Sequence, residues 1–158
     1  KGFEELREAE LIDTLPVFIG VQTEGCSPTV DAFISGADEI ARFHSPHTLD
    51  HVLENPLPAS GNQIIRKLRA IGGHMVKVSN DEIKRAIRLL AEEGVFAQPA
   101  SACSVAALHR CIDEKIVDGN GSVVSIVTGS GLKYPPVLES LGLESKSVST
   151  DELSNVFS

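Results

Sequence analysis

Residues 74–94 read HMVKVSNDEIKRAIRLLAEEG, a strand pattern followed at once by a helix pattern. The apolar run at 74–79 comes directly after two glycines and is typical of a strand. Ser79 and Glu82 have the spacing of a capping box, and Gly94 is placed to end the helix behind them. The apolar residues of that helix recur on one face: Ile83, Ala86, Ile87, Leu90 and Ala91. This stretch therefore predicts one strand–helix unit of an α/β fold.

The same order of elements recurs on both sides of this unit. Apolar runs at 17–22 and 122–128 also follow turn residues and are predicted as strands. The run 122–128 is almost continuously apolar, which is typical of a central strand buried on both faces. Further helices are predicted near 2–12, 28–41, 60–71, 99–116 and 136–141, with a short closing helix within 145–158. Alternating strands and helices predict a single α/β domain over residues 1–158, a three-layer αβα arrangement with a mostly parallel sheet.

The composition and net charge exclude some classes of binding partner. The chain has 158 residues, 42% of them hydrophobic, and a formal net charge of −8. That charge repels phosphate backbones and anionic membrane surfaces, so neither nucleic acid nor a membrane is expected as a partner. No run reaches the roughly 18 to 20 apolar residues of a membrane span, and the charged N-terminus does not resemble a signal peptide. Because the first residue is Lys1 and not Met, we expect the functional protein to extend further upstream.

The cysteines predict a reducing, cytoplasmic location. There are three of them, and no two form a C-x-x-C pair. Cys103 and Cys111 fall on the helix predicted at 99–116, whose small apolar residues cover all sides, so we interpret both as buried fillers. Cys26 follows a strand end and is expected to be the more accessible thiol, although no histidine is near it in the sequence.

Ligands of parallel sheets bind beyond the carboxyl ends of the strands, and two segments fit that place. Thr128 ends the most apolar predicted strand and runs into the glycine turn Gly129–Gly131. The second segment, Gln98–Ser101, opens the helix of small residues. One interpretation is a ligand site in which backbone N–H groups bind an anion. The other is that the glycines only permit a tight turn, since an isolated G-x-G is weak support for a site.

The histidines offer a different hypothesis. His44, His47 and His51 have the pattern H-x₂-H-x₃-H, with Asp50 beside the last of them. If this stretch were helical, His47 and His51 would share a face at a spacing close to that of zinc ligands. The simpler alternative is a polar surface helix. Because there is neither an H-E-x-x-H signature nor a pair of cysteines, no metal site is predicted.

Three motifs carry a resemblance to a known family. They are IGVQ at 19–22 with CSP at 26–28, EGVFAQPASA at 93–102 and TGSGLKYP at 128–135. In this order they resemble the second half of threonine synthases, within the tryptophan-synthase-β family of pyridoxal-phosphate enzymes. The resemblance implies fold type II, with this chain as the C-terminal segment of a larger two-domain enzyme and part of its large cofactor domain. It also implies conversion of O-phosphohomoserine and water into threonine and phosphate.

The resemblance assigns roles to a few positions. Thr128 matches the residue whose hydroxyl bonds the pyridine nitrogen of pyridoxal 5'-phosphate, and Gly129 matches the glycine that shapes the turn beneath the ring. Gln98 is a departure, because similar enzymes usually have Glu at this position, and it keeps a different substrate as an alternative. No catalytic residue is assigned, because the lysine that binds the cofactor and the loop that holds its phosphate are expected before Lys1. The isolated chain is therefore expected to be inactive.

Two alternatives stay open. One is a paralogous pyridoxal-phosphate enzyme with another phosphorylated or hydroxylated amino acid as its substrate, such as cysteate synthase. The other is a non-catalytic α/β module that binds an anion at the turn Gly129–Gly131. In either case a chain cut from a larger enzyme exposes apolar surface, so we expect self-association and a homo-oligomer.

Overall fold

The strand and the helix predicted within residues 74–94 are both present in a computed structural model, which describes residues 1–118, 120–143, 147–152 and 156. They are β2 (His74–Val78) and α4 (Asn80–Glu92). The Ser79 hydroxyl accepts the N–H of Glu82 at 3.2 Å, and the Glu82 carboxylate accepts the N–H of Ser79 at 2.6 Å. The predicted capping box is therefore complete, and it satisfies backbone donors that the first helical turn leaves open.

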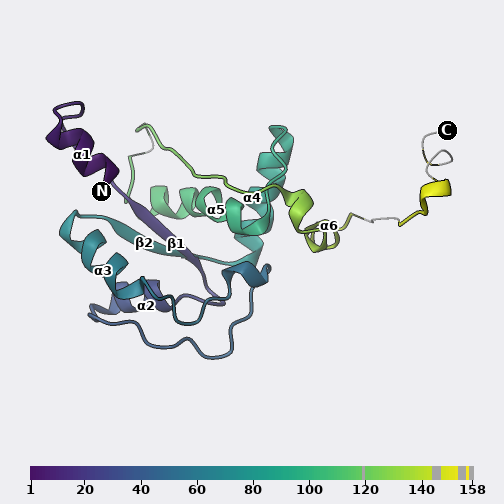
Figure 1. Ribbon diagram of the computed structural model, residues 1–158, viewed down its shortest axis with the longest axis horizontal. Helices are drawn as coiled ribbons and strands as arrows, with labels where there is room; N and C mark the ends of the chain where they lie inside the picture. The colour runs from purple at the N-terminus through teal and green to yellow at the C-terminus, as the bar shows by residue number, and fades with distance from the viewer. Residues whose placement is uncertain (119, 144–146, 153–155, 157–158) are drawn as a thin grey trace.

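The sheet lies between two layers of helices (Figure 1). Its first strand, β1 (Ile19–Thr23), pairs in parallel with β2. The helices α2 (Pro28–Ser35) and α3 (Gly61–Ala70) lie on one side of it, and α4 and α5 (Pro99–Asp113) lie on the other. The α/β class and the parallel pairing are confirmed.

The remaining elements are short. They are α1 (Gly2–Glu8), α6 (Pro136–Ser140) and the 3-10 turns η1 (His51–Leu53), η2 (Gly131–Lys133) and η3 (Thr150–Glu152). The helix predicted near 28–41 ends early, because Gly36 takes a left-handed conformation with φ 78°. Of the closing helix predicted within 145–158, only η3 and residue 156 are described as helical, and 145–146, 153–155 and 157–158 lie outside the described residues.

The main core joins the sheet to the pair α4 and α5. Val76 and Val78 of β2 pack in one buried cluster with Ile83 and Ile87 of α4. Small buried residues of α5 complete this cluster: Ala102, Cys103, Ala106, Ala107 and Cys111. The small side chains let the two helices approach each other and the sheet closely, as the composition of the helix predicted.

A side chain of β1 positions the other helical layer. Both Thr29 and Val30 donate their backbone N–H to Gln22 Oε1, at 2.9 and 3.0 Å. Ser27, the N-cap residue of α2, makes no capping bond with its side chain. Gln22 therefore supplies the acceptor that an N-cap residue usually provides, and it fixes the start of α2 to the sheet.

The prediction of a buried central strand at 122–128 is wrong for this chain. Within the described residues the sheet has two strands, and neither of them is this segment. Its side chains are among the most exposed apolar ones, with Val124 at 83% and Ile126 at 67%. The segment runs in extended form past α5 toward α6 (Figure 1). A strand forms only where its backbone N–H and C=O groups bond to a neighbouring strand. In the described residues, no strand lies beside this segment.

Among the helices that the structure describes, none has the length and apolar character that crossing a membrane requires.

Candidate functional site

The two segments singled out as ligand sites lie against each other. The N–H of Gln98 donates to the carbonyl of Gly129 at 3.0 Å, and the N–H of Gly131 donates to the carbonyl of Phe96 at 2.8 Å. Ala97 and Ser130 form the antiparallel bridge between these two bonds. The glycine turn is thereby fixed to the chain that leads into α5, and the two segments form one candidate site.

A side chain at the start of α5 completes this junction. Ser101 Oγ accepts the backbone N–H of Gly129 at 2.7 Å and lies 3.2 Å from Thr128 Oγ1. Ser101 is 2% exposed, whereas Thr128 is on the surface. The sequence placed Ser101 in the right segment but gave it no role, because a serine in a first helical turn has many functions. The structure shows a surface hydroxyl held in place by a buried one.

Both glycines of the turn lie close to a neighbouring side chain, and neither has a positive φ. A Cβ on Gly129 would lie 2.5 Å from the side-chain amide carbon of Gln98, and one on Gly131 would lie 2.6 Å from the ring of Phe96. A larger residue at Gly129 would require the flexible Gln98 amide to move, and one at Gly131 would require the Phe96 ring to move. The role of Gly129 in shaping the turn beneath the cofactor stays a prediction.

Most of the backbone donors at the turn are already in use. The N–H groups of Gly129 and Gly131 bind within the junction, and the N–H of Leu132 donates to Ser130 Oγ at 3.2 Å. An anion bound by more than the N–H of Ser130 would have to displace these bonds. This observation weighs against the interpretation of the turn as an anion site.

The residues present fit one part of a pyridoxal-phosphate site. Thr128 offers a neutral hydroxyl on a rigid support, which suits a contact to an aromatic ring nitrogen. Gly129 adds no side chain of its own, and the side-chain amide of Gln98 lies where its Cβ would be. Among the lysines with described side chains, Lys1, Lys77 and Lys84 each lie in an ion pair with a carboxylate of the chain. No residue of the described chain is assigned to the cofactor's phosphate or its covalent attachment.

The histidine hypothesis requires a helix that is not there. Residues 44–50 are not helical, and only the short turn η1 begins at His51. Asp50 is 1% exposed, accepts the N–H of Val52 at 3.1 Å and lies 3.7 Å from His51 Nδ1. Over the described ranges, no cluster of three or more His, Cys, Asp or Glu residues has a geometry that could hold a metal ion.

All three thiols are buried, which corrects the expectation that Cys26 is accessible. Burial, together with the charge of Glu54, raises the pKa of Cys26. Burial also raises the pKa of Cys103 to about 12, with a further contribution from Asp50, and raises that of Cys111. A thiol that does not ionise is a poor nucleophile, so none of the three is a catalytic candidate.

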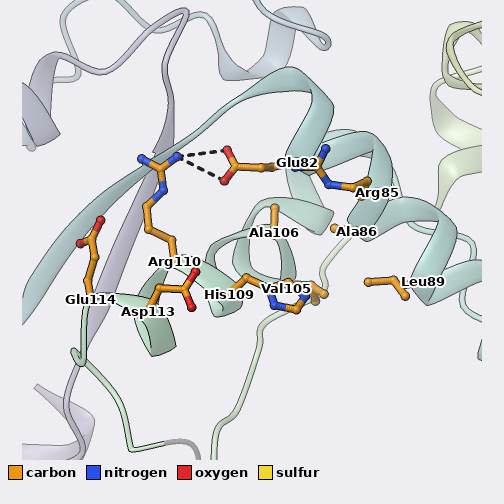
Figure 2. Close-up of a pocket in the computed structure, with 10 residues that line it drawn as sticks. All are labelled: Glu82, Arg85, Ala86, Leu89, Val105, Ala106, His109, Arg110, Asp113 and Glu114. Atoms are coloured by element: carbon orange, nitrogen blue, oxygen red, sulfur yellow. Dashed lines mark hydrogen bonds and ion pairs between the residues drawn. The ribbon is translucent and has the colours of Figure 1, made fainter.

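A cleft of about 460 Å³ lies between α4 and α5, and Thr128 is not among the residues that line it. Figure 2 shows the lining side chains. The Arg110 guanidinium donates to both carboxylate oxygens of Glu82 at 3.2 and 3.3 Å, and it lies 3.6 Å from Glu24. Burial opposes ionisation of Glu82, but its hydrogen bonds with Ser79 and Arg110 outweigh burial and lower its pKa. Arg110 therefore joins Glu82 and Glu24 in a structural ion-pair group at this cleft.

Comparison with known proteins identifies the family. Residues 1–129 match the family of pyridoxal-phosphate dependent enzymes, and the chain belongs to that family. Its relatives include threonine synthases from Methanocaldococcus jannaschii, 37% identical, Methanosarcina acetivorans, 36%, and Mycobacterium tuberculosis, 35%. Each match extends over 136 residues, or 85% of this chain and 34 to 36% of the relative. The chain therefore spans about a third of the length of these relatives.

A solved structure gives a partial superposition. The crystal structure of a threonine deaminase from T.th. matches 60% of this chain and 33% of its own, with 25% sequence identity and a TM-score of 0.48.

Proposed function

We propose that this chain is the segment of a threonine synthase-like enzyme that contacts the ring nitrogen of pyridoxal 5'-phosphate through Thr128. The complete enzyme would convert O-phosphohomoserine and water into threonine and phosphate. The observation that carries this proposal is the junction of Thr128, Gly129 and Ser101, which presents one anchored hydroxyl at the surface. Identities of 32 to 37% with threonine synthases over 85% of the chain support it.

The chemistry of Thr128 suits this reaction. Pyridoxal phosphate, when bound, supplies an electron sink for elimination and replacement on an amino-acid side chain. A carboxylate beside the ring nitrogen would hold a proton there and make the sink stronger. The neutral hydroxyl of Thr128 offers a hydrogen bond without a charge, and the buried Ser101 keeps that hydroxyl in place. The chain thereby contributes positioning at the ring nitrogen and not the bond-breaking groups.

The proposal includes a larger sheet in the complete protein. We propose that residues 122–128 become a strand of a fold type II cofactor domain, with further strands supplied by the rest of a two-domain enzyme. The exposed apolar side chains of Val124 and Ile126 support this, as does the length of the relatives. The isolated 158-residue chain exposes this surface, so we propose that it self-associates as a homo-oligomer, which sedimentation velocity tests.

The identity of the substrate rests on the surroundings of Gln98. Its side chain packs directly beneath Gly129, where similar enzymes usually have Glu. The amide carries no charge, so the electrostatic field beside the turn differs from that of those enzymes. A related pyridoxal-phosphate enzyme acting on another phosphorylated amino acid, such as cysteate synthase, is therefore the second candidate.

The test uses the protein expressed from the complete reading frame of the gene. Phosphate release is measured with O-phosphohomoserine and, separately, with O-phosphoserine plus sulfite, and threonine is measured as the product of the first. Thr128→Val removes the hydroxyl and nearly keeps the shape, so we expect kcat/KM to fall about tenfold or more. Thr14→Val, at an exposed position outside the site, is the matched control.

Either of two results would contradict the proposal. Equal turnover of the wild type and Thr128→Val removes the assignment at the ring nitrogen. Absence of cofactor from the complete protein, seen as no absorbance beyond that of the polypeptide, leaves only a shared fold.

A further inference from the structure

We propose that Ser101 is a positioning residue, which fixes Thr128 Oγ1 as an outward hydrogen-bond donor and so selects a ring nitrogen that carries no proton. The inference rests on the proposed function, because it assumes that Thr128 contacts that nitrogen. Ser101 itself does not reach the surface, since only 2% of it is exposed. It acts through Thr128.

The geometry around Ser101 limits what its hydroxyl can do. A hydroxyl has one proton to donate and two lone pairs that accept. One lone pair of Ser101 Oγ takes the N–H of Gly129 at 2.7 Å. The other polar neighbour of this oxygen is Thr128 Oγ1 at 3.2 Å, and in this pair either oxygen has the geometry to be the donor.

The position of the hydroxyl protons decides whether Ser101 donates to Thr128 or Thr128 donates to Ser101. If Thr128 donated to Ser101, the proton of Ser101 would be left in a buried place without another hydrogen-bond acceptor among the described residues. An unsatisfied buried donor is costly, whereas the proton of an exposed hydroxyl can always find water. The favoured chain of bonds therefore runs from the N–H of Gly129 to Ser101 and from Ser101 to Thr128. The proton of Thr128 is then free for an external acceptor.

The surrounding backbone keeps this chain of bonds rigid. Ser101 lies in the first turn of α5, where its N–H donates to the carbonyl of Gln98 at 3.0 Å. The N–H of Gln98 in turn donates to the carbonyl of Gly129, which closes a loop of bonds around the junction. Thr128 and Ser101 are thus held at one separation by bonds that do not involve their hydroxyls. A donor bonded into such a network is also polarised by it.

This arrangement distinguishes two forms of the ring nitrogen. An unprotonated nitrogen is an acceptor, and it matches the proton that Thr128 has free. A protonated nitrogen would need Thr128 to accept and to send its own proton elsewhere. The network therefore favours the neutral ring, which is the weaker electron sink.

Ser104 provides a matched control one turn further along α5. Its Oγ bonds to the carbonyl of Ile126 at 3.2 Å and lies 3.4 Å from the carbonyl of Ser101. It therefore touches the same incoming segment as Ser101 but does not contact the hydroxyl of Thr128. Ser104→Ala therefore measures how the loss of a serine hydroxyl from this helix changes cofactor binding when the hydroxyl of Thr128 is not affected.

The experiment is a double-mutant cycle on the protein from the complete reading frame, read by its dissociation constant for pyridoxal phosphate. We expect Thr128→Val to weaken binding about tenfold and Ser101→Ala about fivefold. If Ser101 acts through Thr128, the double variant is at most about twofold weaker than Thr128→Val alone, and not weaker by the product of the two effects. Ser104→Ala is expected to stay within about twofold of the wild type.

A second measurement, the ¹⁵N resonance of the cofactor ring nitrogen, reports on the hydrogen bond to that nitrogen. With cofactor labelled by ¹⁵N in the ring, we expect the nitrogen resonance of Ser101→Ala to move toward that of Thr128→Val and away from the wild type. A loss of packing alone would not move this resonance. Ser101→Cys, close in size, replaces Ser101→Ala if the alanine variant does not fold, as judged by its melting temperature.

The outcomes separate this inference from the proposed function. If Thr128→Val binds the cofactor as the wild type does, the role of Thr128 fails and both proposals are overturned. If Thr128→Val weakens binding but the Ser101 variants do not, or if the effects multiply, Thr128 keeps its role and the inference about Ser101 is overturned. A fully coupled cycle with a shifted nitrogen resonance supports both.

Discussion

Two apolar segments of this chain look alike in sequence and differ in the structure. Val78 ends the strand β2 with 0% exposure, whereas Val124, in the run 122–128, is 83% exposed. Both runs are rich in β-branched residues and both follow turn residues. The difference lies in their partners. β2 pairs along its whole length with β1, while no strand lies beside 122–128 in the described chain.

The comparison shows which sequence patterns predict structure from nearby residues alone. The capping box and helix after β2 satisfy their hydrogen bonds within about four residues of themselves, so the pattern and the structure agree. A strand satisfies its bonds with residues that are distant in the sequence. The run 122–128 has the composition of a buried strand, but composition does not supply the neighbours. Three predictions test this difference, from the largest expected effect to the smallest.

Amide hydrogen exchange should separate the two segments most widely. We expect the amides of β2 to be protected by several orders of magnitude relative to those of 123–127, because none of the latter donates a hydrogen bond to the described chain. The measurement is exchange followed by mass spectrometry or NMR on the 158-residue chain. The same experiment on the complete reading frame should show 123–127 protected. Fast exchange there would contradict the proposed larger sheet.

One substitution made at two places gives the next largest effect. Val78→Ala leaves a cavity in the core and should lower the free energy of unfolding by about 2 kcal/mol. Val124→Ala, the matched control, should change it by less than about 0.5 kcal/mol, because this side chain is already in water. Urea denaturation with an unchanged m value measures both. Equal losses for the two variants would mean that 122–128 is buried in solution.

The smallest predicted effect is a dependence on pH. The pKa of Glu82 is lowered in the folded chain from its ordinary value of 4.5. The ionised carboxylate therefore stabilises the fold at pH values above 4.5. That stabilisation is lost as the pH falls through the lowered pKa. Glu82→Gln cannot ionise, so we expect it to be about 1 kcal/mol less stable than the wild type at pH 7. The gap should close under acid conditions.

The control for this prediction is Glu92→Gln, which changes the net charge equally at an exposed position near the end of α4. Its stability relative to the wild type should vary little with pH. A gap for Glu82→Gln that stayed constant from neutral to strongly acid pH would rule out the capping carboxylate as the source of the effect.

Part of the candidate site was predicted from the sequence. The motifs at 93–102 and 128–135 were singled out separately, and they meet in the structure through Gln98, Gly129 and Gly131. Ser101 received no role, because its bonds go to residues 27 and 28 positions away. The accessibility predicted for Cys26 was wrong for a similar reason, since tertiary contacts and not its place after a strand bury it.

By itself, the sequence determined the elements whose hydrogen bonds close locally and the family to which the chain belongs. The capping box at Ser79 and Glu82 and the strand–helix order follow from residues a few positions apart. Only the tertiary structure decided which apolar run is buried, which thiols are shielded and which hydroxyl supports Thr128. The physical reason is the range of the interactions. Burial and strand pairing depend on neighbours that are far away along the chain, so local composition does not fix them.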